Sequence, residues 1–284
     1  MIREFDLTTP DGRVLHAYDT GPRDDDHLVV VWHHGTPNIG APPQPLFGAE
    51  WGLRVRWVSY DRPGYGGSTT KAGRDIASAA TDVGHVADEL GIERFAVMGH
   101  SGGSPHALAC AALLPHRVLA AATIASLAPR SAEGLDWFAG MAGSSRASLG
   151  AAAEGRSAKE RYEATAEFDP TVFTPADHAA LGGSWSWLLD VVRPALAAGP
   201  AALIDDDLAY VAPWGFDLST ITAPTLLMHG AADRMVPPSH SEWLADHCAS
   251  ATLQLHPGDG HISILNSAPS ALAWLCERAV HSSP

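Results

Sequence analysis

The sequence predicts an α/β fold in which a mostly parallel β-sheet carries helices on both faces. Short apolar runs without polar alternation recur along the 284 residues, as is typical of strands that are buried on both faces. Helix-compatible stretches separate these runs, notably at 75–90 and 104–114. Strands and helices that alternate at this spacing favour parallel pairing with right-handed crossovers. A composition of 46% hydrophobic and 18% charged residues supports a large core and excludes a mainly disordered chain.

The first elements are predicted to form an edge of the sheet and then its centre. Residues 2–20 alternate around a Pro-Asp-Gly-Arg turn, which is typical of a β-hairpin at a sheet edge. Four apolar runs follow, at 28–32, 55–60, 95–98 and 118–124. We expect these runs to be buried strands.

The rhythm of strands and helices breaks after Pro129 and resumes near 225. Residues 130–212 contain no comparable apolar run and are rich in Ala, Gly and Trp. The later elements are expected as a strand at 225–229, a helix near 239–247, a strand at 252–255 and a helix near 269–280. We therefore predict a core domain of residues 1–129 and 213–284, into which 130–212 is inserted as a helical unit.

Charge and cysteine content exclude several classes of function. The net charge of −14 argues against nucleic acid or an anionic membrane as partners, because both would repel the chain at long range. The three cysteines, Cys110, Cys248 and Cys276, lack C-x-x-C spacing, so neither a disulfide framework nor a metal site is predicted. No signal peptide and no apolar run of about 18 residues is present, so we expect a cytoplasmic protein without a membrane span.

One short segment predicts nucleophilic chemistry. Residues 97–103, Val-Met-Gly-His-Ser-Gly-Gly, place Ser101 in a G-x-S-x-G pattern between an apolar run and a helix-compatible stretch. This pattern is typical of a nucleophile elbow, a sharp strand-to-helix turn that raises the serine hydroxyl above the sheet. Glycines two residues on either side permit the close packing that such a turn requires.

A serine hydroxyl needs a base, and the base needs an acid that orients it. Asp233 follows the apolar run at 225–229, and His261 follows the run at 252–255. Because the carboxyl ends of parallel strands meet at one edge, we expect both side chains to lie near Ser101. The order Ser, Asp, His along the chain is also one of the orders in which such triads occur.

The same chemistry requires donors for a negatively charged oxygen in the tetrahedral intermediate. The amide of Gly102, at the start of the helix after the elbow, is one predicted oxyanion-hole donor. The amide of Thr36, in the loop after the run at 28–32, is the second, because Pro37 has no N–H.

Five motifs in this order resemble the α/β-hydrolase superfamily over residues 10–280. They are His-Gly-Thr-Pro at 34–37, Tyr-Asp-Arg-Pro-Gly-Tyr-Gly-Gly-Ser at 60–68, the elbow, the segment 229–237, and Gly-His at 260–261. The chain is similar to serine-nucleophile members with a helical cap, such as esterases, methylesterases, carbon-carbon bond hydrolases and proline iminopeptidases. The resemblance implies the α/β-hydrolase fold, an eight-stranded, mostly parallel sheet with the cap (lid) after its sixth strand, and no cofactor.

The resemblance also separates this chain from some relatives. Epoxide hydrolases and haloalkane dehalogenases carry aspartate where this chain has Ser101, which disfavours those activities. Proline iminopeptidases usually carry tryptophan directly after the serine, whereas Gly102 stands here. An aminopeptidase would also need an acid such as Glu163 or Glu167 turned towards the substrate ammonium. Acidic residues of the insertion, including Asp205, Asp206 and Asp207, are otherwise expected to form a solvated face.

Several further residues are candidates for contact with substrate. His34 adjoins the oxyanion loop and His100 precedes the nucleophile, although either could instead pack inside the core. Trp137, Trp185 and Trp214 could form the ceiling of an apolar pocket or the small core of the insertion itself.

The sequence therefore predicts a serine hydrolase that cleaves an ester or related activated carbonyl of a small-molecule substrate through an acyl-enzyme. Amide or prolyl-peptide hydrolysis, carbon-carbon bond hydrolysis and perhydrolysis are alternatives within the same machinery. A weakly catalytic ligand-binding protein on the same fold is the alternative from another class. The substrate, the pathway and the oligomeric state do not follow from the sequence.

Overall fold

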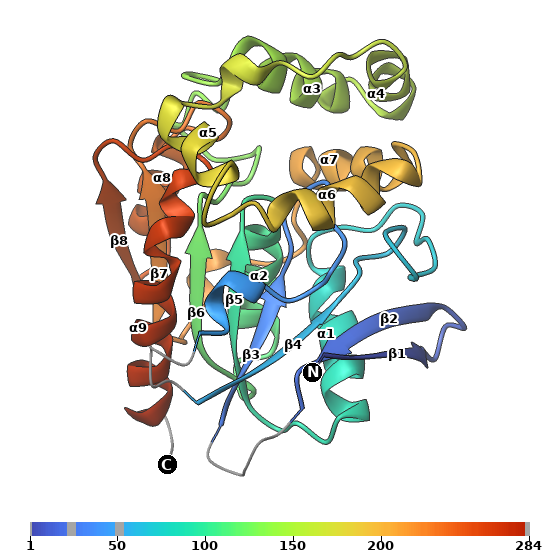
Figure 1. Cartoon of the computed structure of the whole chain (residues 1–284), viewed down its shortest axis with the longest axis vertical. Coiled ribbons are helices and arrows are strands. Elements are labelled where there is room, and N and C mark those ends of the chain that lie inside the picture. The colour runs from blue at the N-terminus through green and yellow to red at the C-terminus, as the bar shows by residue number, and fades with distance from the viewer. Residues whose placement is uncertain (1, 22–26, 49–53, 282–284) are drawn as a thin grey trace.

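A computed structural model describes residues 2–21, 27–48 and 54–281 (Figure 1). The strands are β1 (Arg3–Thr8), β2 (Val14–Asp19), β3 (Leu28–His33), β4 (Val55–Tyr60), β5 (Phe95–His100), β6 (Val118–Ile124), β7 (Thr225–Gly230) and β8 (Ala251–His256). They form one eight-stranded sheet in the order β1-β2-β4-β3-β5-β6-β7-β8. β1 pairs antiparallel with β2 and β2 with β4, and every other pairing is parallel. The predicted edge hairpin and parallel centre are confirmed.

Helices complete the fold on both faces of the sheet and above it. The α-helices are α1 (Ser78–Glu89), α2 (Gly103–Leu113), α3 (Gly143–Ala153), α4 (Arg156–Glu163), α5 (Pro175–Leu181), α6 (Leu188–Ala197), α7 (Ala201–Val211), α8 (Ser239–His247) and α9 (Ala268–His281). Short 3-10 helices are η1 (Gln44–Leu46), η3 (Pro170–Val172), η4 (Leu218–Thr220) and η5 (Ser263–Ser267). Among the described residues, none of these helices is long and apolar enough to cross a membrane.

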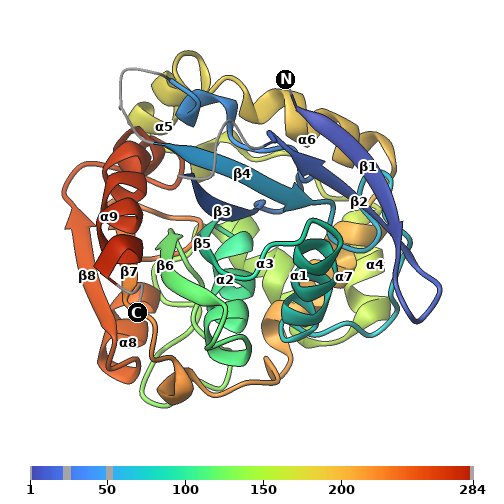
Figure 2. The same ribbon diagram turned by 90° about the horizontal axis from the view of Figure 1, so that it is seen from below.

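The two faces of the sheet are buried in two separate hydrophobic clusters. Val97 belongs to the cluster that α1, α2 and α8 cover, whereas its neighbour Met98 belongs to the cluster that α9 covers. Figure 2 shows α9 on one side of the strands and α1 and α2 on the other. The central strands β5, β6 and β7 are buried along their whole length, so most of their residues are apolar, which explains the continuous runs in the sequence.

Helices α3 to α7 lie between β6 and β7 in the chain and above the carboxyl ends of the strands in space (Figure 1). We call these helices and their connections the cap. All residues of the segment 130–212 are described, and none of them forms a strand. Helix α5 begins with a capping box, in which the Thr174 side chain accepts from the Asp177 amide and the Asp177 side chain accepts from the Thr174 amide. The sequence thus places a helical layer directly over the end of the sheet where strand-end loops meet.

The connection from β5 to α2 is a tight turn around Ser101. Ser101 has a φ of 52°, in the left-handed region that residues with side chains rarely adopt. A Cβ on Gly99 would lie 2.6 Å from the Gly103 carbonyl oxygen, and a Cβ on Gly103 would lie 2.0 Å from the His33 carbonyl oxygen. Both glycines are therefore required by close backbone packing around the serine.

We predict that Gly103→Ala destabilises the protein by about 3 kcal/mol or more, because a backbone carbonyl cannot move away from the added methyl as a side chain would. The free energy of unfolding in urea measures the effect. Gly84→Ala is the control, since Gly84 lies within α1 with no atom within 4 Å of the added Cβ. That variant should be about 0.5–1 kcal/mol more stable than wild type. Equal stability of the two variants would contradict the packing argument.

Candidate active site

Ser101, His261 and Asp233 come together at the carboxyl ends of three different strands. Ser101 follows β5, Asp233 follows β7 and His261 follows β8. The His261 Nε2 atom lies 2.8 Å from the Ser101 Oγ atom, and the His261 Nδ1 atom lies 2.6 Å from the Asp233 Oδ2 atom. With Nδ1–H donating to the carboxylate, Nε2 is left as the acceptor for the serine proton. The arrangement has the geometry of a nucleophile, a base and a carboxylate that orients the base.

The Asp233 carboxylate is held in its ionised form. Burial alone would raise its pKa, but the neighbouring imidazoles of His261 and His229 more than offset this, so the pKa lies below the usual value. Its Oδ1 atom accepts the amides of Met235 at 2.8 Å and Val236 at 3.0 Å. His229, which the sequence analysis did not single out, places Nε2 3.3 Å from Oδ2. Asp233 is therefore both charged and fixed in orientation.

His261, the predicted base, is buried near two carboxylates and a neutral histidine. Burial by itself would lower the pKa of His261, but the charge of Asp233, with a smaller contribution from Asp177, raises the pKa above its ordinary value. His100 donates from Nε2 to the His261 carbonyl oxygen at 3.0 Å. Burial and the nearby His261 lower the pKa of His100 to about 3, so its ring is neutral. His100 therefore holds the backbone of the base without adding charge.

The residues that carry the two predicted oxyanion donors are neighbours in space but belong to different elements. Gly102 is at the N-terminus of α2, where the helix dipole favours a negative charge, and Thr36 is in the loop after β3. Neither amide donates a hydrogen bond to any residue that the structure describes. A Cβ on Gly102 would lie 2.1 Å from the Tyr210 hydroxyl oxygen, so any side chain there would collide with the cap. The tryptophan of proline iminopeptidases does not fit at this position.

A fully buried carboxylate of the cap, Asp206 on α7, connects the cap to the oxyanion loop. Its Oδ2 atom lies 2.7 Å from the Arg62 Nη2 atom and its Oδ1 atom 2.6 Å from the Arg74 Nη2 atom. It also accepts hydrogen bonds from the hydroxyls of Thr36 at 2.5 Å and Tyr65 at 2.9 Å. Burial would raise its pKa, but the two guanidinium groups lower the pKa well below the usual value. Asp206 is therefore ionised at neutral pH.

Arg62 extends this connection to the backbone beneath the oxyanion donors. Its guanidinium donates to the carbonyl oxygens of His34 and, at 2.9 Å, Gly35, and to the Thr36 hydroxyl at 2.9 Å. The Tyr210 hydroxyl, also from α7, donates to the Gly102 carbonyl oxygen at 3.0 Å. The loop that carries the Thr36 amide is thus held from the cap as well as from the core.

The candidate substrate-contacting residues lie inside the protein. His34 donates from Nδ1 to the Gly35 carbonyl oxygen at 2.8 Å and accepts the Arg62 amide at Nε2 at 3.1 Å, so both ring nitrogens are bonded internally. The three candidate tryptophans all belong to the two hydrophobic clusters: Trp137, Trp185 and Trp214. Trp137 donates to the Ala128 carbonyl oxygen at 2.8 Å and Trp214 to the Tyr210 carbonyl oxygen at 3.2 Å. Their placement is that of packed core residues.

The expectation of a solvated acidic face is wrong for Asp206 and Asp207, which are 0% and 8% exposed. Asp207 lies 2.6 Å from the Nζ atom of the buried Lys159, which also binds Glu163 at 2.6 Å. In the sequence, the run of three acids at 205–207 suggested a solvated face and gave no indication that two of them are buried. A signal was present in the helical spacing, because Asp206 shares a face with Ala202 and Tyr210, four residues to either side.

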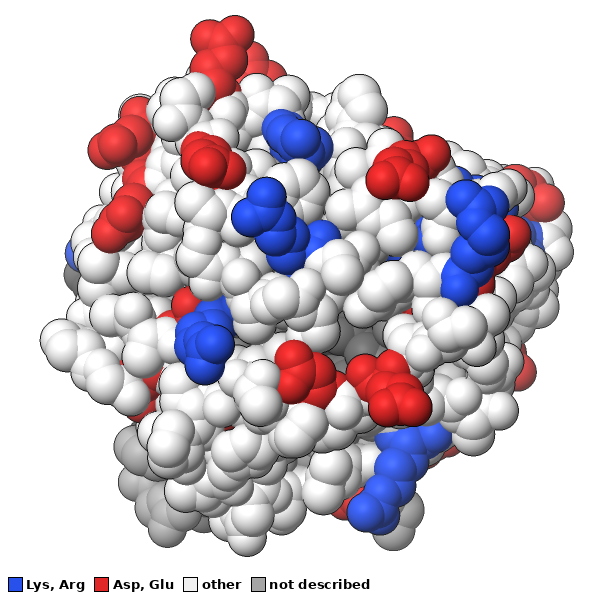
Figure 3. Space-filling view, turned by 90° about the horizontal axis from the view of Figure 1, so that it is seen from above, with Lys and Arg blue, Asp and Glu red and all other residues white. Residues whose placement is uncertain are grey.

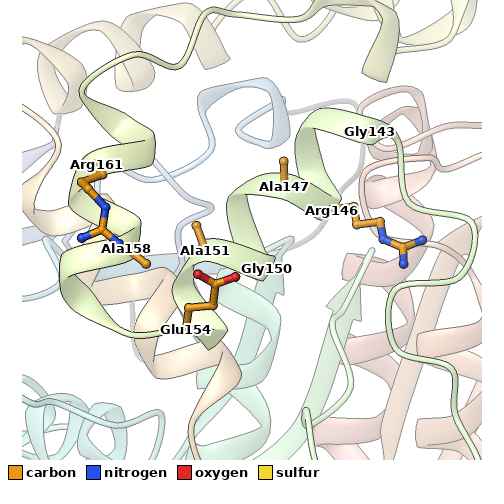
Figure 4. Close-up of a pocket in the computed structure, with 8 residues that line it drawn as sticks. All are labelled: Gly143, Arg146, Ala147, Gly150, Ala151, Glu154, Ala158 and Arg161. Atoms are coloured by element: carbon orange, nitrogen blue, oxygen red, sulfur yellow. The ribbon is translucent and has the colours of Figure 1, made fainter.

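A separate pocket of about 540 Å³ lies in the cap between α3 and α4. Figure 4 shows the side chains of Arg146 and Arg161 at its two ends, with Glu154 between them. None of the three residues of the Ser101 site lines it. Figure 3, viewed from the cap side, shows acidic and basic side chains interspersed with uncharged ones. Within the described part of the chain, no group of three His, Cys, Asp or Glu residues could hold a metal ion.

The chain belongs to the α/β-hydrolase fold family, whose model matches residues 29–268. It is 36% identical over 126 residues to a bifunctional esterase/perhydrolase of Acinetobacter calcoaceticus, which is 43% of this chain and 44% of that protein. The match thus spans less than half of that relative.

Two further comparisons cover nearly the whole chain. The chain is 28% identical over 285 residues to a pimeloyl-[acyl-carrier protein] methyl ester esterase of Aromatoleum aromaticum, covering 96% of this chain and 99% of the relative. The structure of a thermophilic esterase from Thermogutta terrifontis superposes with a TM-score of 0.69 at 20% identity, covering 98% and 99% of the two chains. The structural likeness shows a shared fold.

We predict that Asp206→Ala destabilises the protein by about 3–5 kcal/mol, because it leaves two buried guanidinium groups without their counter-charge. Urea unfolding, with the slope of the transition compared with wild type, measures the loss. Asp205→Ala is the matched control: its partner Arg156 has a side chain that is 45% exposed, so the variant should lie within about 1 kcal/mol of wild type. A similar loss in both variants would refute the role of the buried pair.

Proposed function

We propose that the protein is a serine hydrolase that cleaves carboxylic esters of small molecules through an acyl-enzyme. The observation that carries the proposal is the hydrogen-bonded series Ser101, His261 and Asp233, with Ser101 at a left-handed φ above the sheet. A serine in this setting has a base within reach of its proton and an oriented acid behind the base. Membership of the α/β-hydrolase fold family supports the same class of reaction.

In the first half-reaction the Ser101 Oγ atom attacks the ester carbonyl carbon while His261 Nε2 takes the hydroxyl proton. The carbonyl electron pair moves onto the oxygen, which the amides of Gly102 and Thr36 stabilise. The tetrahedral intermediate collapses, the bond to the alcohol oxygen breaks, and His261 returns the proton to the departing alcohol. Water then repeats the attack on the acyl-enzyme, which releases the acid and restores Ser101.

Three observations favour an ester over an N-terminal peptide bond. The Glu163 carboxylate is engaged by the buried Lys159, so it is not a free partner for a substrate ammonium. Gly102 cannot be replaced by a larger residue beside Tyr210. The relatives from Acinetobacter calcoaceticus and Aromatoleum aromaticum are both described as esterases.

Perhydrolysis is a second candidate because the Acinetobacter calcoaceticus relative is described as an esterase/perhydrolase. Hydrogen peroxide would take the place of water in attack on the acyl-enzyme, with the same proton transfers at His261. We further propose that residues 130–212 act as the cap domain over a core of 1–129 and 213–284, and that the cap decides which small molecules reach Ser101.

We predict that Ser101→Ala lowers hydrolysis of short p-nitrophenyl esters by at least about 10⁴-fold, because no covalent intermediate can form. Steady-state turnover at several ester chain lengths measures the loss, and the thermal unfolding midpoint shows that the fold is retained. Ser145→Ala, on α3, is the control and should keep wild-type turnover.

Three outcomes would contradict the proposal or favour another function. Undiminished hydrolysis by Ser101→Ala would refute it. Release of a single equivalent of p-nitrophenol by wild type, without sustained turnover, would favour a ligand-binding protein. Faster cleavage of prolyl-naphthylamide than of any ester would favour an aminopeptidase.

The acidic limb of the pH profile should report His261. Only the neutral imidazole accepts the serine proton, and the pKa of His261 is raised above 6.5 by Asp233 and Asp177. We therefore predict that kcat/KM falls as pH falls, with a midpoint above 6.5. Rates with an uncharged ester between about pH 5 and 9 measure the limb. A midpoint below the ordinary histidine value would contradict the raised pKa.

A further inference from the structure

We propose that Asp177, a buried carboxylate of the cap helix α5, is a positioning residue for His261 and holds it within reach of Ser101. The inference rests on the proposed function, because it assigns a role in delivering the base of that reaction. It makes part of the cap necessary for the geometry of the chemistry, beyond its role in covering the site.

The Asp177 carboxylate binds the chain directly after the base. Its Oδ1 atom accepts the amide of Ile262 at 2.8 Å, the amide of Ser263 at 2.7 Å and the hydroxyl of Ser263 at 3.0 Å. The Asp177 side chain is 0% exposed, so these bonds are not in competition with water. They join residues that are 85 and 86 positions apart in the chain, and so fix the cap to the loop that carries His261.

The same carboxylate also restricts the residue before His261, which is Gly260. A Cβ on Gly260 would lie 2.1 Å from the Asp177 Oδ2 atom, so only glycine permits this close approach. The Gly260 amide donates to the Ser263 hydroxyl at 2.7 Å, and that hydroxyl donates to Asp177. The residues on both sides of His261 are therefore restrained by one cap side chain, directly or through Ser263.

Helix capping alone does not account for these contacts. In the capping box of α5, the Oδ2 atom accepts the Thr174 amide at 2.8 Å and the Thr174 hydroxyl at 2.9 Å. The Oδ1 atom is directed to the His261 loop and takes no part in the capping box. The two oxygens thus serve two different elements, and their roles can be separated by mutation.

The charge of Asp177 acts on the base as well. Burial would raise the pKa of Asp177, but the amides of Ser263, Thr174 and Ile262 lower it, so the group is ionised. The groups that face His261 are Asp233 after β7, neutral His100 on β5, Asp177 on α5 and the Ser101 hydroxyl. Of the two carboxylates, only Asp177 belongs to the cap.

The test compares Asp177→Asn with Thr174→Ala in the full-length protein, using a short p-nitrophenyl ester over the pH range. Asp177→Asn should lower kcat about tenfold with little change in KM, because the base is displaced while the ester site is not. Its acidic limb should move to lower pH, because loss of the negative charge makes the His261 imidazolium easier to deprotonate. Thr174→Ala, which loses the capping hydroxyl and the γ-methyl group but keeps the Asp177 carboxylate, should keep the wild-type kcat and limb.

A third variant keeps the proposal testable if Asp177→Asn does not fold. Ser263→Ala removes the link to the Gly260 amide but retains the Asp177 charge, so kcat should fall about threefold while the acidic limb stays in place. A wild-type kcat in Asp177→Asn, or an equal loss of kcat in Thr174→Ala, would overturn the positioning role. A wild-type rate that does not depend on Ser101 would instead overturn the proposed function.

Discussion

One buried ion cluster joins the cap to the core at the oxyanion loop. Asp206 has no exposed surface and lies between Arg62 and Arg74, so three charges are removed from water together. Such burial is tolerated only where the charges compensate one another and the lone pairs are bound. Because Arg62 also binds the carbonyl oxygens beneath Thr36, the interaction that seats α7 also shapes the oxyanion loop.

The cap therefore contacts both loops of the candidate site through buried carboxylates. Asp206 engages the loop of the oxyanion donors, and Asp177 engages the loop of the base. Each is an ionised carboxylate that is fully buried and accepts several hydrogen bonds, and hydrogen bonds to charged groups are strong and directional in such a setting. A cap attached by apolar contacts alone would leave both loops less restrained.

The residues of the candidate site could be predicted because each follows a pattern in its local sequence. The turn at Ser101 needs glycines at fixed offsets, and the strands before Asp233 and His261 leave continuous apolar runs. The contacts of the cap left a weaker pattern, because helical spacing places Asp206 on the face of Ala202 and Tyr210 but does not identify its partners. Asp206 stands in a run of three acids that resembles a solvated face, and its partner Arg62 is 144 positions away.

By itself, the sequence determined the order of strands and helices and the position of the elbow, because hydrophobic periodicity and turn chemistry act over a few neighbouring residues. It also predicted His261 as the base and Asp233 as its acid, and the structure places both beside Ser101. Only the tertiary structure showed which acidic residues are buried and that a side chain at Gly102 would collide with Tyr210. It also showed that both ring nitrogens of His34 form hydrogen bonds inside the core. These properties depend on which distant groups meet when the cap closes over the sheet, and the free energy of a buried charge is set by the partners it finds there.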